Sequence, residues 1–428
     1  MRFWKLATAA IVATLLVGCG PPQVDQSNSG ADSRTGTLRV WLFDEANRDP
    51  KEKVVNAAVE EFEKNHRDVT VEVRYIAVDT RSERFTGAFN DPSSAPDVAE
   101  FGNTDLASYV TAGGMSDLTG MIEDWPAATD LSDSVLDTAK VDDKVYGVPW
   151  FTGVRALYYR TDVFDELGLE PPRSLGELVE TARRIRSERP DMYGIAAGGK
   201  YTYAMMPFIW AAGGELAERG NGSWRSAIDG EASRRGVRTY TSLLDPAICP
   251  PDQCAQLTGT ESVQAFAGGK AAMTIGGDFN RTAVNEGAAG DKYDVVPLPG
   301  QRTGSIAPAF AGGNLLGVLR SSDHSTLAQE FIKVLAGKKY QRRMYEAMSY
   351  LPTFEDVQDK VAADDPAIEP FIDTLQAGTR FVPSTPAWSE IDAQEILPTM
   401  AQRIATGEEV RPATQRAAER MNSAFGDR

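Results

Sequence analysis

The sequence predicts an α/β protein that folds into two lobes, and three observations support this fold class. The chain has 428 residues, of which 42% are hydrophobic, and this length allows one large domain or two to three smaller ones. A strand, a helix and a second strand follow one another within residues 37–76. Further short strands are spread along the chain too widely for one sheet of ordinary size. Two α/β lobes are therefore expected.

Hydrophobic periodicity predicts the first elements. Residues 37–43, TLRVWLF, are a nearly continuous apolar run, which is typical of a parallel strand covered on both faces. In residues 53–64 the apolar side chains recur on one face of a helix. Residues 69–76, VTVEVRYI, alternate between apolar and polar, which indicates a second strand. Together these segments predict a βαβ unit.

Strands and helices continue to alternate further along the chain, and residues 145–159 read as extended. The other predicted strands are 97–101, 271–275 and 293–297, and the other predicted helices are 174–188, 325–336 and 341–348. The tail from 389 to 425 is predicted to be mostly helical, with Pro398 and Pro412 as interruptions.

The composition excludes several kinds of function. Lys and Arg number 44 against 61 Asp and Glu, so the net charge is −17. Such a surface repels phosphate backbones and anionic lipid, and nucleic-acid binding is not expected. The chain has only two histidines, so a histidine-based metal site or catalytic cluster has few possible members. We predict no cofactor and no metal.

The N-terminus reads as a targeting signal. Two basic residues precede an apolar stretch over 6–17, which is too short to span a membrane comfortably. The run LVGC at 16–19 resembles the bacterial lipobox, in which cleavage leaves Cys19 first with a lipid on its thiol. Residues 1–18 are therefore predicted to be a lipoprotein signal peptide. The alternative is an ordinary secretory signal with an incidental cysteine.

The segment after the predicted cleavage site is polar. Residues 19–36 lack any apolar period and read as a flexible tether. No later segment has eighteen consecutive apolar residues. We expect the protein to lie outside the cytoplasm, anchored by its lipid to the outer face of the cell membrane.

The two remaining cysteines lie close together in a proline-rich loop. Cys249 and Cys254 belong to the segment CPPDQC. Disulfides persist outside the cytosol, so we predict a local disulfide. A metal-binding pair is the alternative, but no histidine is near and this spacing alone is a weak signal.

The sequence carries few patterns that are typical of enzymes. The two GGK triplets are not phosphate-binding loops, and neither a G-x-S-x-G elbow nor an H-E-x-x-H motif is present. Asp44 and Glu45 directly follow the first strand, and ligands of open α/β sheets gather at strand ends. A glycosidase needs two carboxyl groups at a set separation, and Asp278 is a further acid to consider. A secreted glycosidase therefore stays an alternative.

Several segments together resemble the carbohydrate-binding solute receptors of ABC importers, the maltose-binding-protein-like family 1 of extracellular solute-binding proteins. The segments, in chain order, are VWLFDEANRD, APDVAEFGNTDLASYVTAGGMSDLT, VYGVPWFTGVRALYYRTDVF, PFIWAAGGE, SVQAFAGGKAAMTIGGDFNR, PAFAGGNLLGV and TPAWSEI. The resemblance covers nearly all of residues 37–425. It implies a type II periplasmic-binding-protein-like fold, with a ligand cleft between lobe 1 (37–147 and 305–350) and lobe 2 (148–304 and 351–428).

The resemblance also implies the residues of the cleft. It places Asp44, Glu45, Asn103 and Thr104 on the side of lobe 1, and Trp150, Arg155, Tyr203, Asp278, Phe279 and Trp388 on the hinge or lobe 2 side. Gly277 and Asn314 stand where the backbone turns beside the ligand or re-enters lobe 1. Aromatic rings cover the apolar faces of a sugar, while charged and amide groups bond to its hydroxyls.

Each of these residues also has a structural alternative. The tryptophans and Phe279 could pack in a core, and Arg155 could simply pair with an acid. Phe101 and Gly153 stand where some family members place a tryptophan or a carboxylate, so the ligand is not carried over from the family.

The resemblance implies a receptor that captures a solute and delivers it to an ABC permease. We expect a monomer that binds a di- or oligosaccharide without chemistry on the sugar, because the candidate aromatic residues outnumber what one ring can cover. The first alternative is a receptor of the same shape for another solute, such as a polyol phosphate or a peptide. The second is the secreted glycosidase.

Overall fold

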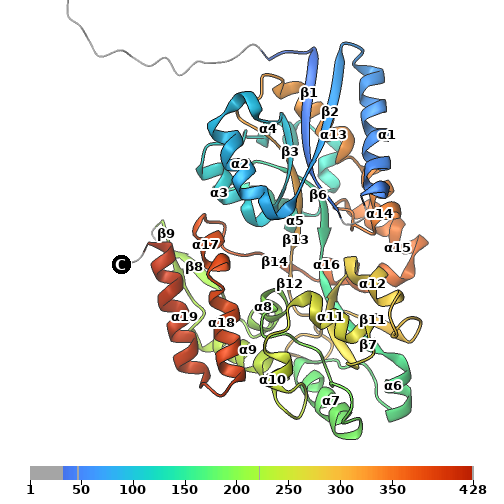
Figure 1. Cartoon of the computed structure of the whole chain (residues 1–428), viewed down its shortest axis with the longest axis vertical. Coiled ribbons are helices and arrows are strands. Elements are labelled where there is room, and N and C mark those ends of the chain that lie inside the picture. The colour runs from blue at the N-terminus through green and yellow to red at the C-terminus, as the bar shows by residue number, and fades with distance from the viewer. Residues whose placement is uncertain (1–31, 46–47, 221, 427–428) are drawn as a thin grey trace, which may run out of the picture.

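The chain folds into two lobes, each built around its own β-sheet (Figure 1). The computed structural model describes residues 32–45, 48–220 and 222–426. The predicted signal peptide over 1–18 and the predicted lipid-bearing Cys19 lie outside the described residues. Within the described ranges, no helix has the length and apolar character needed to cross a membrane.

Lobe 1 contains a five-stranded sheet in the order β2-β1-β3-β13-β6. These strands are β1 (Gly36–Phe43), β2 (Val69–Ile76), β3 (Val98–Gly102), β6 (Val148–Gly153) and β13 (Gly312–Val318). β1 runs parallel to β2 and β3, and β13 runs antiparallel to β3 and β6. Helix α1 (Asp49–Asn65) joins β1 to β2, so the predicted βαβ unit is confirmed.

Helices pack on both faces of this sheet, and the apolar side chains of β1 point alternately toward the two faces. Leu38, Val40 and Leu42 pack against α1 and two later helices, whereas Trp41 and Phe43 pack on the other face. The other elements of lobe 1 are α2 (Arg81–Asn90), α3 (Leu106–Thr111), α4 (Thr119–Glu123), α5 (Asp133–Leu136), β4 (Lys140–Val141), β5 (Lys144–Val145), α13 (Ser325–Leu335) and α14 (Lys338–Met348).

Lobe 2 contains a three-stranded antiparallel sheet in the order β10-β7-β11. Its strands are β7 (Arg155–Arg160), β10 (Met273–Gly277) and β11 (Tyr293–Val296), beside a hairpin of β8 (Ala217–Gly220) and β9 (Ser223–Ser226). Its helices are α6 (Thr161–Leu167), α7 (Leu175–Glu188), α8 (Thr202–Ala211), α9 (Glu231–Thr241), α10 (Pro251–Cys254), α11 (Gly259–Ala267), α12 (Arg281–Asn285), α15 (Glu355–Asp364), α16 (Glu369–Gln376), α17 (Ala387–Ala393), α18 (Ile396–Ala405) and α19 (Val410–Phe425).

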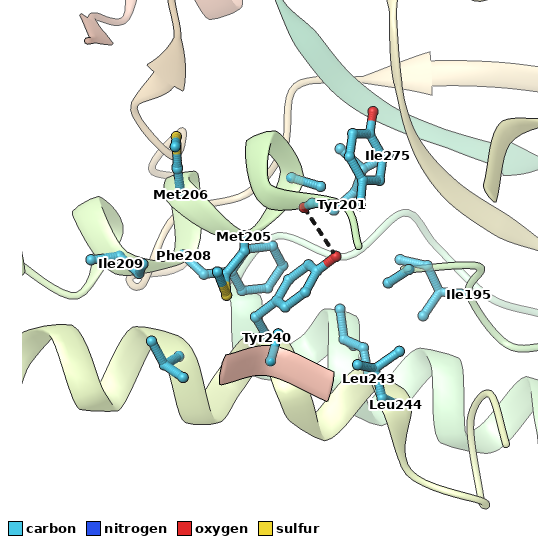
Figure 2. Packing of buried hydrophobic residues seen from close by; sticks show 14 of the residues in the cluster. Ile195, Tyr201, Met205, Met206, Phe208, Ile209, Tyr240, Leu243, Leu244 and Ile275 are labelled. Atoms are coloured by element: carbon cyan, nitrogen blue, oxygen red, sulfur yellow. Dashed lines mark hydrogen bonds between the residues drawn. The ribbon is translucent and has the colours of Figure 1, made fainter. Parts of the chain in front are cut away.

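The core of lobe 2 holds the loop before α8 and the start of that helix in place. Tyr240 is fully buried among residues that include Met205, Phe208 and Leu243 (Figure 2). Its hydroxyl donates to the carbonyl of Gly198 at 2.6 Å, and the carbonyl of Tyr201 lies 3.4 Å away. These contacts fix the start of α8.

The lobes are joined by several short crossings of the chain. Only Val154 separates β6 in the first sheet from β7 in the second. A second crossing joins β12 (Ala309–Phe310) to β13, where β12 pairs with β14 (Thr379–Arg380). The predicted lobe limits stay a prediction. Because β6 pairs with β13, we propose a limit near residue 154 instead of 148.

Two expectations about chain segments are corrected. Pro398 and Pro412 do not interrupt helices, since each lies in the first turn of α18 or α19, where a missing N–H costs no intrahelical hydrogen bond.

The predicted tether over 19–36 also ends earlier than residue 36. Asp32 accepts a hydrogen bond from the backbone N–H of Thr326 at 3.0 Å, and Arg34 pairs with Glu330 at 3.0 Å.

Candidate functional site

Three cavities lie side by side between the lobes. The polar hollow has a volume of about 570 Å³ and is lined by residues that include Arg81, Thr104, Asp105, Ser108, Tyr203, Trp388 and Asp392. The middle hollow has about 380 Å³, and its lining includes Arg155, Lys200, Tyr201, Tyr203, Phe279 and Asp392. The aromatic hollow has about 640 Å³, and its lining includes Glu45, Phe151, Arg155, Asp278, Phe279, Phe310, Asn314 and Tyr350.

The three hollows are parts of one cleft because neighbouring hollows share side chains. Tyr203 and Asp392 line both the polar and the middle hollow. Arg155 and Phe279 line both the middle and the aromatic hollow. The walls come from both lobes, with α2 and α3 on one side and α8 and α17 on the other. Cavities of this size and mixed lining are typical of small-molecule sites.

Arg155 stands at the junction of the middle and aromatic hollows. Its Nε donates to the hydroxyl of Tyr201 at 3.0 Å. Its guanidinium carbon lies 5.1 Å from the ring centre of Tyr203 and 5.6 Å from those of Tyr201 and Phe279. The rings hold the charge in place by cation–π attraction. The terminal nitrogens of this side chain form no further hydrogen bond with the described residues, so they can donate to a ligand.

Aromatic rings form two stacks along the cleft. Tyr203 stacks on Phe310 with ring centres 4.6 Å apart, and Phe310 stacks on Phe381 at 5.7 Å. Phe151 and Tyr350 stack at 4.2 Å in the aromatic hollow. Burial raises the pKa of Tyr203 to about 12, so its hydroxyl keeps its proton at neutral pH. The cleft therefore offers flat apolar surfaces beside hydrogen-bonding groups.

Charged groups from both lobes meet in the polar hollow. Arg81 donates through Nε to Asp105 at 2.8 Å within lobe 1. Asp392 of lobe 2 lines the same hollow, and burial raises the pKa of this carboxyl. The hydroxyls of Ser108 on α3 and Ser389 on α17 are 3.1 Å apart, which places a hydrogen bond between the lobes at this end.

Asp278 lies beside the crossing between the lobes. Its side chain is 1% exposed, and Oδ1 accepts the backbone N–H of Val154 at 3.1 Å. Burial raises the pKa of Asp278 to about 7. In the unfolded chain the same carboxyl has a pKa of about 4. Between about pH 4 and 7 the folded protein therefore keeps a proton that the unfolded chain has lost. The free energy of unfolding therefore falls as the pH rises through this window.

Replacing Asp278 by asparagine should remove this loss of stability at high pH. The amide keeps an oxygen for the N–H of Val154 and carries no charge to desolvate. We expect Asp278→Asn to match the wild type near pH 4 and to exceed its free energy of unfolding at pH 8 by on the order of 1 kcal/mol or more. Urea unfolding at both pH values measures this. Asp165→Asn, an exposed site on α6, is the control, and equal pH profiles for wild type and Asp278→Asn would contradict the prediction.

The structure brings most of the predicted site residues to the cleft. Those that line it are Glu45, Thr104, Arg155, Tyr203, Asp278, Phe279, Asn314 and Trp388. Trp388 does so although it is only 2% exposed, whereas Phe279 is 46% exposed. Their role in ligand binding stays a prediction.

Trp150 is the main correction, because it is not in the cleft. It is fully buried in the core between the lobe 1 sheet and α1, below Nζ of Lys51. Successive side chains of a strand point to opposite faces, so the neighbouring Phe151 reaches the aromatic hollow instead.

Three further predicted residues lie next to the cleft without lining a hollow. Asn103 is buried, and its Nδ2 donates to the carbonyl of Ala311 at 2.9 Å, so it holds a crossing of the chain. Asp44 is exposed, and its Oδ1 lies 3.6 Å from Nη1 of Arg48. The carbonyl of Gly277 accepts the buried hydroxyl of Tyr158 at 2.7 Å. These residues have structural partners.

Sequence reasoning missed other lining residues. These are chiefly Arg81, Asp105, Phe151, Phe310, Tyr350 and Asp392. A signal was available for Asp392, which lies one helical turn after Trp388 on α17. Phe310 lies within PAFAGGNLLGV, a segment that resembles the family but in which only Asn314 was predicted to meet the ligand. No local pattern distinguishes Arg81 from other surface arginines.

The two-lobed α/β fold with a ligand-sized cleft between the lobes defines a binding protein of the periplasmic receptor class. Residues 57–370 match the family model of the bacterial extracellular solute-binding proteins, and the chain belongs to this family. The protein is therefore an extracytoplasmic solute receptor, and the resemblance seen in the sequence is confirmed.

Curated relatives and solved structures agree with this assignment. The chain is 26% identical to the diacetylchitobiose-binding protein DasA of Streptomyces coelicolor, over 91% of this chain and 90% of that one. It is 26% identical to the galactooligosaccharide-binding protein of Bacillus subtilis, over 84% and 81%. The sugar-binding protein MalE of Xanthomonas citri has the same fold, with a TM-score of 0.81, 22% identity and coverage of 91% and 98%. The GacH receptor of Streptomyces glaucescens gives a TM-score of 0.75 at 23% identity, with coverage of 92% and 99%.

Proposed function

We propose that this protein is the substrate-binding receptor of an ABC sugar importer and that it captures a di- or oligosaccharide between its lobes. The observation that carries this proposal is the continuous cleft, in which stacked rings alternate with Arg155, carboxylates and amides. Rings match the apolar faces of sugars, and the polar groups match their hydroxyls. The volume of three joined hollows favours more than one sugar ring.

The relatives support a carbohydrate ligand. Two relatives are named for diacetylchitobiose and for galactooligosaccharides, and structures of the same fold hold acarbose or maltotetraose. Ligand binding favours the closed state only as far as its affinities for the open and closed states differ. The closed receptor then delivers its sugar to the membrane permease.

A sugar-binding screen tests this function. The purified protein is heated with each of N,N′-diacetylchitobiose, galactobiose, galactotriose, maltose and maltotetraose, and the hits are titrated by calorimetry. At 100 times its Kd a ligand stabilises the folded state by about 2.7 kcal/mol. A raised unfolding temperature with one sugar class supports the proposal. If none of these sugars binds while a peptide or a polyol phosphate does, the ligand class is wrong and the receptor fold stands.

We propose that the protein does not hydrolyse its ligand. The family and the relatives named above are binding proteins. The same purified protein should release no nitrophenol from nitrophenyl glycosides. A release rate that scales with protein concentration and disappears in Asp278→Asn would establish the glycosidase alternative.

We also propose that residues 1–18 are removed and that Cys19 carries the lipid anchor. The support is the LVGC run after a basic start and an apolar stretch. Mass spectrometry of the protein from its producing cell should show a chain that begins at Cys19 and carries a diacylglyceryl group on its thiol. An unmodified Cys19 would contradict the anchor.

Cys249 and Cys254 lie side by side, and we propose that they form a disulfide. Their Cα atoms are 5.9 Å apart, and both side chains are buried. A bond across so short a loop stabilises by roughly 2 kcal/mol in the chain-entropy account. The Cys249→Ala/Cys254→Ala double variant should lose about that much in urea unfolding and bind sugar normally. Detection of two free thiols in the unfolded, unreduced protein would show that the bond is absent.

A further inference from the structure

A buried ion pair lies behind the lobe 1 wall of the aromatic hollow. Lys51 on α1 and Glu100 on β3 have fully buried side chains, and Nζ is 3.0 Å from Oε2. Nζ also donates to the carbonyl of Phe43 at 2.9 Å and to Oε1 of Glu45 at 3.0 Å. Oε2 of Glu100 accepts the backbone N–H of Phe43 at 2.7 Å. Charged groups are rarely buried so completely unless every hydrogen bond is made, as it is here for the ammonium.

This ion pair reaches the cleft through two side chains. Glu45 lines the aromatic hollow with its carboxylate 26% exposed. Asn314 on β13 lines the same hollow, and its Nδ2 donates to Oε1 of Glu100 at 2.6 Å. A carboxylate has no proton to donate, so the amide nitrogen must face Glu100. The amide oxygen is then left as a hydrogen-bond acceptor for the cleft.

The charges around this wall of the aromatic hollow balance. Lys51 carries one positive charge and Glu45 and Glu100 carry one negative charge each, and Arg155, which lines the same hollow, supplies the second positive charge. One N–H of the Asn314 amide is held by Glu100, so the amide oxygen and the carboxylate of Glu45 are left as acceptors beside the second N–H of that amide. These two acceptors fit hydroxyl groups, which can donate.

We propose that Lys51 and Glu100 are positioning residues that hold Glu45 and Asn314 as an acceptor pair, so that this end of the cleft selects ligands that donate hydrogen bonds from hydroxyl groups. The inference rests on the proposed function, namely that the cleft binds a sugar. Neither Lys51 nor Glu100 touches the ligand, and both act through the two residues that line the hollow.

Glu100→Gln is the sharpest test because it changes one atom at a buried site. The oxygen of the new amide must stay with the two donors, Phe43 N–H and Lys51 Nζ. Its nitrogen then faces Nδ2 of Asn314, and two donors cannot bond to each other. The amide of Asn314 therefore turns over and presents N–H groups to the cleft in place of an oxygen.

The expected result is a loss of affinity with a preserved fold. Calorimetry with galactobiose, maltotetraose and N,N′-diacetylchitobiose should show a loss of about 10-fold or more for whichever of these sugars the wild type binds. Asp97→Asn is the matched control, because Asp97 is also a buried carboxylate beside β3 but lies at the strand end away from the cleft. It should bind within about twofold of wild type.

Lys51→Met tests the positioning role without any ligand. Loss of the ammonium should speed amide hydrogen exchange in peptides covering residues 40–45, relative to wild type and to Lys53→Met, an exposed site on the same helix. If Lys51 acts through Glu45, the Lys51→Met/Glu45→Gln double variant should bind sugar no more weakly than Glu45→Gln alone. A purely structural role would make the two losses additive.

Distinct outcomes overturn the inference and the proposed function. Unchanged affinity in Glu100→Gln or unchanged exchange in Lys51→Met would each overturn the positioning proposal. If Lys51→Met speeds exchange but no neutral sugar binds the wild type, the acceptor wall stands and the proposed sugar ligand fails.

Discussion

Replacing Arg155 by alanine is expected to weaken sugar binding by about 100-fold or more. The guanidinium is a cation at the junction of two hollows, its faces are covered by three rings, and its terminal nitrogens have no hydrogen-bond partner among the described residues. Loss of a charge-assisted hydrogen bond costs about 1.5–3 kcal/mol, and loss of two such bonds to neighbouring hydroxyls accounts for the expected factor. Calorimetric titration with the best sugar of the screen measures the effect.

Two further variants show whether the loss in Arg155→Ala comes from ligand binding or from the fold. Arg155→Lys keeps the charge but loses the planar fork, so its affinity should lie between those of the wild type and the alanine variant. Arg183→Ala, at an exposed position on α7, should bind normally. If Arg155→Ala binds within threefold of the wild type while its unfolding free energy drops, Arg155 is a structural residue and the ligand lies elsewhere in the cleft.

Replacing Trp150 by alanine is expected to lower the free energy of unfolding by about 3–5 kcal/mol, because the variant leaves a cavity in the core of lobe 1. Urea unfolding measures this loss. Sugar affinity below the unfolding transition should fall far less than in Arg155→Ala, since the ring does not reach the cleft. A ligand-stacking tryptophan would show the opposite pattern, with affinity lost and stability kept.

Trp150→Phe separates the contribution of the ring volume from that of the buried indole N–H. The indole N–H is buried and has no hydrogen-bond partner among the described residues, so phenylalanine removes an unsatisfied donor while it keeps most of the apolar volume. Its cost in stability should therefore be much smaller than that of alanine. Trp224→Ala, at a half-buried position on the β8–β9 hairpin, should cost little and serves as the control.

The sequence is informative where a local pattern determines the structure. The alternation in residues 69–76 and the helical face over 53–64 each reflect the burial of one face, and both segments form as predicted. Glu45 could be placed near the cleft because it follows the first strand, whereas Arg155, Asp278 and Phe279 were placed there by the resemblance to the family.

Local patterns fail where both faces of an element are buried or where partners come from distant segments. In β6, Pro149 and Trp150 are both buried, so alternation does not show which face meets the cleft. Arg81 and Asp392 belong to different lobes and meet in the polar hollow only after the chain has crossed between the lobes. Lys51 resembles an ordinary surface lysine on α1, because no residue near it in the sequence indicates that Glu100 is its buried partner.

The position of β13 in the first sheet bears on how the protein is made. β13 lies between β3 and β6, yet it leaves the ribosome only after every strand of the β10-β7-β11 sheet. Until then β6 has no neighbour in its sheet and β3 has an open edge, so lobe 1 cannot close during most of synthesis. Such distant pairing folds slowly. A chain that stays unfolded while it is being made is well suited to thread through a narrow export channel before it folds on the far side.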